Sequence, residues 1–72
     1  MRANKYYVVY YLDQGNISVF HRWEETRRAL VGRPNRYKGV RNRNEAIKWL
    51  DGIGVDCRLY DRLAGIPVVD YP

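Results

Sequence analysis

Two aromatic residues in the middle of the chain, Trp23 and Tyr37, have cations as close neighbours in the sequence. Arg22 precedes Trp23, and Tyr37 lies between Arg36 and Lys38. Rings that stack on bases or sugars, together with cations that contact phosphates, are typical of proteins that bind nucleic acid. The alternative is that each ring only packs in the protein, as a tryptophan at the start of a helix commonly does. The sequence predicts a nucleic-acid interface around these two residues.

The basic residues are concentrated in the same part of the chain. Residues 22–48 contain nine of the 13 lysines and arginines but only three glutamates, a net charge of +6 in a chain whose total is +5. Residues 1–21 carry +1 and residues 49–72 carry −2. Ten of the 13 cations are arginine, whose planar guanidinium suits bidentate phosphate contact and stacking. A solvated basic face is the alternative, but this concentration favours binding to a polyanion.

Other kinds of site find little support. Cys57 is the only cysteine and His21 the only histidine, which argues against a disulfide framework and a zinc site. The eight acidic residues are scattered, without the carboxylate cluster that metal-dependent nuclease chemistry requires. We therefore expect no metal, no cofactor and no enzymatic activity. Without a secretion signal or a membrane span, and with a single cysteine, we expect an intracellular protein, cytoplasmic or nuclear, with no membrane partner.

The first half of the chain predicts a hairpin followed by a helix. Residues 5–12 are almost all aromatic or β-branched, the types that favour a strand, and their side chains should alternate between two faces. A turn with Gly15 then leads to a return strand over residues 17–21. From residue 23 to residue 31 the apolar spacing becomes helical. Gly32 and a proline two residues later should end this helix.

The second half predicts one more strand and one more helix. Residues 36–41 alternate in character and predict the third strand. Asn42 and Glu45 have the spacing of a capping box, so a second helix should begin after Asn42 and end at Gly52. This order, β-β-α-β-α, predicts an α+β fold: a three-stranded antiparallel sheet with two helices, plus a C-terminal extended segment. The expected core residues are Tyr6, Val8, Val9, Val19, Leu30, Val40, Ala46, Trp49 and Leu50.

The C-terminal residues, 53–72, give weaker signals. Residues 55–60 predict a strand, and residues 66–71 predict an extended edge segment, since Pro67 disfavours a central strand. We expect this extension to pack on the preceding part or to extend the same domain.

An ordered set of motifs runs through residues 5–52. It consists of a strand from Tyr6 to Val9, the pair Val19-Phe20, Trp23 with Glu25, Arg36-Tyr37-Lys38 with Val40, and Glu45-Ala46 with Trp49-Leu50. In this order and spacing, the chain resembles the N-terminal hybrid-binding domain of eukaryotic type-1 ribonuclease H, which is shared with the caulimovirus protein viroplasmin. The resemblance assigns residues 1–52 to such a domain and leaves residues 53–72 outside it. It implies the same sheet and two helices, and non-catalytic binding of RNA/DNA hybrid or double-stranded RNA without sequence preference.

The resemblance also implies roles for individual residues. Trp23 and Tyr37 would pack on sugars of the DNA strand, Lys38 would contact phosphate, and backbone amides of residues 33–36 would meet RNA 2′-hydroxyls. The candidate nucleic-acid-binding residues are thus Trp23, Arg27, Arg33, Asn35, Arg36, Tyr37 and Lys38.

The chain departs from the family pattern at three positions. Ser18 replaces a glycine in the second strand, Arg22 replaces the Ser or Thr that would cap the first helix, and Gly39 replaces a second lysine found in some members. The preference between hybrid and double-stranded RNA is therefore left open.

A protein–protein interaction module, such as a viral or phage factor that binds a host protein, is the alternative function. Seven tyrosines would suit such an interface, since tyrosine buries a large area at little entropic cost. Under this alternative the C-terminal segment would complete the sheet, form a homodimer or bind a protein partner.

Overall fold

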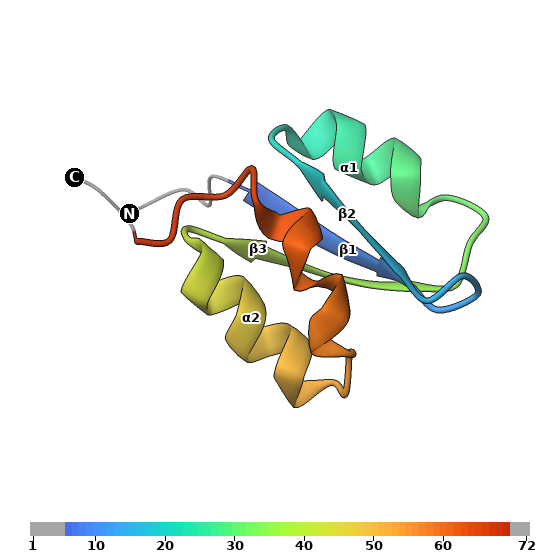
Figure 1. The fold of residues 1–72 in the computed structure, drawn as a ribbon. Helices are drawn as coiled ribbons and strands as arrows, with labels where there is room; N and C mark the ends of the chain where they lie inside the picture. The colour runs from blue at the N-terminus through green and yellow to red at the C-terminus, as the bar shows by residue number, and fades with distance from the viewer. Residues whose placement is uncertain (1–5, 70–72) are drawn as a thin grey trace.

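The computed structural model describes residues 6–69 of the chain. A three-stranded antiparallel sheet has α1 on one face and α2 on the other, with η1 beside α2 (Figure 1). The predicted α+β fold, with three antiparallel strands and two helices, is confirmed. Along the chain the elements are β1 (Tyr6–Tyr11), β2 (Asn16–Phe20), α1 (Trp23–Leu30), β3 (Asn35–Val40), α2 (Arg43–Gly52) and the 3-10 helix η1 (Cys57–Leu63).

The strand order is β2-β1-β3, so β3 is an edge strand. Its register determines which side chains share a face of the sheet. Val8 of β1 is opposite Lys38 of β3, and Val9 is opposite Tyr37. Directly opposed residues of antiparallel strands lie on the same face, and successive residues alternate between faces. Tyr37 and Lys38 therefore lie on opposite faces of the edge strand, as the sequence alternation predicts.

The larger core lies between the sheet and the layer formed by α2 and η1. Five of the predicted core residues are buried: Val8, Val9, Val40, Ala46 and Leu50. The other four are half-buried: Tyr6, Val19, Leu30 and Trp49. Among the described residues, the prediction missed five buried apolar side chains: Tyr11, Ile17, Val55, Leu63 and Ile66.

Helix α1 covers the other face of the sheet, where Val9 and Tyr11 are buried. Thr26 anchors the first turn: its side chain is fully buried and its hydroxyl donates to the carbonyl of Arg22 at 2.8 Å. Arg22, at the N-cap, makes no side-chain capping bond. Gly32 has φ +78°, a backbone conformation that glycine adopts without strain, directly after the end of the helix.

Helix α2 begins as its capping motif predicts. The Asn42 side chain accepts a hydrogen bond from the Glu45 amide at 2.9 Å. The Glu45 carboxylate in turn accepts from the backbone amide of Arg41, also at 2.9 Å. The Glu45 amide, in the first turn, thus gains an acceptor that the helix itself cannot supply, and the second bond ties the residue before the N-cap to the same turn.

The prediction of a strand over residues 55–60 is wrong, because this part of the chain turns into the 3-10 helix η1. Asp56 caps η1 by accepting from the amide of Arg58 at 2.9 Å. The side chains that this segment buries in the core on the α2 face are Val55, Leu63 and Ile66, whose spacing does not alternate as a strand requires.

The predicted extended edge segment over residues 66–71 is not found in the part that the structure describes: residues 66–69 form no strand, and residues 70 and 71 lie outside the described range. Arg43 instead fixes this segment against α2. Its Nε donates to the carbonyl of Ile66 at 2.9 Å, and its backbone amide donates to the carbonyl of Pro67 at 2.7 Å. These bonds hold the C-terminal segment on the same domain.

Candidate nucleic-acid interface

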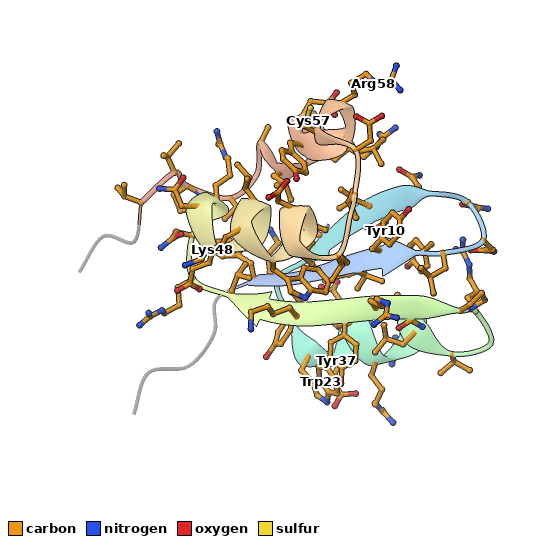
Figure 2. All side chains as sticks on the ribbon, turned by 90° about the horizontal axis from the view of Figure 1, so that it is seen from below. Tyr10, Trp23, Tyr37, Lys48, Cys57 and Arg58 are labelled. Carbon is orange, nitrogen blue, oxygen red and sulfur yellow. The ribbon has the colours of Figure 1, made fainter. Side chains whose placement is uncertain are left out.

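Three aromatic rings form a cluster on the α1 face of the sheet. Tyr7, Trp23 and Tyr37 make up this aromatic cluster: the Trp23 ring centroid lies 5.6 Å from that of Tyr7 and 5.8 Å from that of Tyr37. Trp23 is 41% exposed and Tyr37 is 48% exposed. Figure 2 shows both on the side of the sheet away from Cys57 and Arg58. Two large rings in contact with each other thus remain open to solvent.

Local structure explains why these rings meet. Trp23 is the first residue of α1, and buried Thr26 fixes that turn against the sheet. Tyr37 reaches the same face through the alternation of β3, while its neighbours Arg36 and Lys38 point to the α2 face. The structure therefore brings two of the predicted site residues into contact and places two others across the sheet.

Arg36 and Lys38 are both exposed on β3. Because β3 is an edge strand, no further strand covers its outer side, and a ligand lying there can reach both faces of β3. A ligand along this edge can contact the aromatic cluster on one side and these two cations on the other.

Arg27 lies one helical turn after Trp23, on an exposed part of α1. Its guanidinium is paired with Glu24 at 2.9 Å, and both side chains are more than half exposed. An exposed pair of this kind contributes little to stability, so Arg27 can exchange its partner for a phosphate at small cost.

Arg33 and Asn35 are already engaged within the protein. The Arg33 guanidinium stacks on the ring of Tyr11, with its central carbon 3.8 Å from the ring centroid, and pairs with Asp13 at 3.2 Å. The Asn35 side-chain amide donates to the carbonyls of Leu30 and Arg33. Both side chains shape the loop between α1 and β3.

One of the four residues expected to present a backbone amide to the ligand cannot do so, because Pro34 has no N–H. Arg33 lies in the loop, and Asn35 and Arg36 begin β3, an edge strand that pairs with β1 on one side only.

Sequence reasoning did not list Tyr7 as a site residue, although the structure places it in the aromatic cluster. The alternation of β1 identified its face, but not the fact that α1 would bring Trp23 to that face. In the structure Tyr7 is paired with Gly39 of β3, which has no side chain to cover the ring, and this pairing cannot be read from the sequence.

The pKa shifts that the fold causes lie at the other side of the molecule. The hydrogen bonds from Arg58 lower the pKa of the Asp56 carboxyl, and burial raises the pKa of the Tyr60 hydroxyl. Over residues 6–69, no three His, Cys, Asp or Glu side chains come together as a metal site, and no helix has the length and apolar character to cross a bilayer.

Comparisons of the chain with protein-family models, curated proteins and solved structures returned no match. The resemblance to the hybrid-binding domain therefore rests on the motifs of the sequence and remains a prediction.

Proposed function

We propose that this chain binds RNA/DNA hybrid or double-stranded RNA without reading base sequence and without catalysing a reaction. The observation that carries the proposal is the exposed contact between Trp23 and Tyr37, inside the segment that holds most of the positive charge. The family resemblance supplies the ligand class.

The shape of the ligand suits such a surface. A-form duplexes have a wide, shallow minor groove lined by 2′-hydroxyls and sugars, which a small domain can contact without reaching base edges. The aromatic cluster would pack on sugars of one strand, while Arg36 and Lys38, on the other face of the β3 edge, would contact phosphates. Phosphate contacts supply much of the affinity in complexes of this kind and make it sensitive to salt.

The proposal assigns no chemistry to the chain. Metal-dependent phosphodiester hydrolysis needs carboxylates gathered around the metal ions. Four of the described carboxylates instead form separate ion pairs with arginines: Asp13 with Arg33, Glu24 with Arg27, Glu45 with Arg41, and Asp56 with Arg58.

The alternative function, protein–protein interaction, has less support from the described residues. Tyr11 is buried and Tyr6, Tyr10 and Tyr60 are half-buried against the core, so much of the tyrosine area is used within the fold. The C-terminal segment contributes Val55, Leu63 and Ile66 to the core, while Val68 and Val69 are exposed.

Titration of fluorescent ligands into the protein tests the proposal. The ligands are RNA/DNA hybrid, double-stranded RNA, double-stranded DNA and single-stranded RNA of one length, each at low and at high salt. We expect hybrid or double-stranded RNA to bind most tightly. The logarithm of the binding constant should fall linearly with the logarithm of the salt concentration, with a slope of about −0.9 for each phosphate contacted. Absence of duplex binding at low salt would overturn the proposal, and equal affinity for all four ligands would reduce it to charge attraction.

A further inference from the structure

We infer that Arg33 is a positioning residue of the proposed interface, held by Asp13 and Tyr11, rather than a direct phosphate ligand. This inference rests on the proposed function. In a nucleic-acid-binding protein, a basic loop residue would ordinarily be expected to contact phosphate directly.

The guanidinium of Arg33 is fixed from two directions. It stacks on Tyr11, with its central carbon 3.8 Å from the ring centroid, and Tyr11 is itself only 6% exposed. Its Nη2 lies 3.2 Å from Oδ1 of Asp13, in the turn after β1. These three residues form a clamp between the β1–β2 turn and the loop that joins α1 to β3.

Three hydrogen bonds also hold the loop that joins α1 to β3. The amide of Leu12 donates to the carbonyl of Pro34 at 3.0 Å, directly beside the clamp. The Asn35 side chain donates to the carbonyl of Leu30 at 3.0 Å and to that of Arg33 at 2.7 Å. The loop is therefore tied at its start, its middle and its end.

The position of this loop gives the clamp its consequence. Trp23 lies at the start of α1, Tyr37 lies within β3, and the loop is the covalent link between these two elements. A loop that loosens would let α1 and β3 move relative to each other, and the contact between the two rings would weaken. Preorganised contact surfaces bind more tightly because less freedom is lost on binding.

Direct contact and positioning make opposite predictions for Asp13→Asn. If Arg33 contacts phosphate, Asp13 competes with the ligand, and removal of its charge should tighten binding and steepen the salt dependence. If Arg33 positions the loop, the same substitution should weaken hybrid binding about fivefold and leave the salt slope unchanged. Asp61→Asn is the matched control, because it removes the same charge from an exposed position on η1.

Arg33→Lys separates charge from geometry. Lysine keeps the positive charge but lacks the planar group that stacks on Tyr11 and pairs with Asp13. Positioning predicts a loss close to that of Asp13→Asn, again about fivefold with an unchanged salt slope. Affinity near that of the unaltered protein would overturn the inference.

A measurement without ligand makes the two possible failures distinguishable. The amide of Leu12 reports on the loop, because its hydrogen-bond acceptor is the carbonyl of Pro34. We expect its hydrogen exchange, followed by NMR, to be faster in both Asp13→Asn and Arg33→Lys than in Asp61→Asn. Unchanged exchange in the first two variants would overturn the clamp, whereas faster exchange in a protein that binds no duplex would overturn only the proposed function and the binding role that rests on it.

Discussion

Replacement of Trp23 by alanine tests the proposed interface most directly, because this side chain has two separate roles. It contacts both other rings of the aromatic cluster, and it leaves 41% of its surface open to a ligand. Trp23→Ala should therefore reduce both stability and affinity, by amounts that can be estimated separately.

The expected cost in stability is moderate. Truncation of a fully buried aromatic residue to alanine costs about 3–5 kcal/mol, and a ring that is a little more than half covered should cost about 2 kcal/mol. A chain of 72 residues has a free energy of unfolding of about 4–11 kcal/mol at 0.05–0.15 kcal/mol per residue. The variant should therefore still be mostly folded at 25 °C.

The expected cost in affinity is of similar size. Loss of one aromatic stacking partner costs about 1–3 kcal/mol in single-strand complexes, which corresponds to a Kd about 5- to 150-fold weaker. Fluorescence anisotropy with a labelled RNA/DNA hybrid at low salt measures this change. Urea unfolding followed by circular dichroism measures the stability of the same sample.

Trp49→Ala is the matched control, because Trp49 lies on α2 and packs against the core on the other face of the sheet. It should lower stability without weakening the binding of the folded protein. A folded Trp23→Ala protein that binds the hybrid as tightly as the unaltered protein would refute the assignment of the interface. An unfolded Trp23→Ala protein would assign the ring to the core instead.

Three further predictions use paired variants. Arg27→Gln should lower the slope of log Kd against log salt by about one. Arg58→Gln, which breaks a similar local ion pair elsewhere, should leave the slope unchanged. Equal effects of the two substitutions would mean that only net charge matters. Leu63→Ala should lower the free energy of unfolding, measured in urea, by about 2–5 kcal/mol. Val68→Ala, at a position that is 49% exposed, should lower it by less than about 0.5 kcal/mol. A small loss at Leu63 would contradict its place in the core. The pKa of the Asp56 carboxyl should lie below 3.8, so the contribution of Asp56 to stability is present above that pH and is lost as the pH falls through the lowered pKa. NMR titration of Arg58→Gln should show the pKa of Asp56 returning upward. An unchanged pKa would rule out the contact with Arg58 as the cause of the shift.

The sequence predicts the first 52 residues well because local signals and the final packing agree there. Asn42 and Glu45 start α2 at the predicted place, and Gly32, with φ +78°, follows the end of α1 as predicted. Alternation along β3 correctly separates Tyr37 from Lys38. Each of these features depends on residues within a few positions of one another, which a sequence displays directly.

The C-terminal segment and the clamp depend on partners that are distant in the sequence. Arg43 reaches a carbonyl 23 residues away, and Arg33 pairs with an acid 20 residues away. Neither pairing follows from composition or periodicity. Val55 and Tyr60 are of types that favour a strand locally, but no strand is formed there. The chain instead forms the 3-10 helix η1, and Leu63 and Ile66 are buried in the core with Leu50 of α2.

The separation of rings and cations by the sheet offers a way to locate the ligand on the molecule. Phosphate contacts contribute a term that weakens with salt, whereas ring stacking contributes a term that salt changes little. Variants of Trp23 and Tyr37 should therefore lower affinity equally at all salt concentrations, while variants of Arg36 and Lys38 should lower it mainly at low salt. A ligand that contacts only the α1 face would respond to the first pair alone. A response to both pairs requires a ligand that spans the edge of β3, because these side chains lie on opposite faces of that strand.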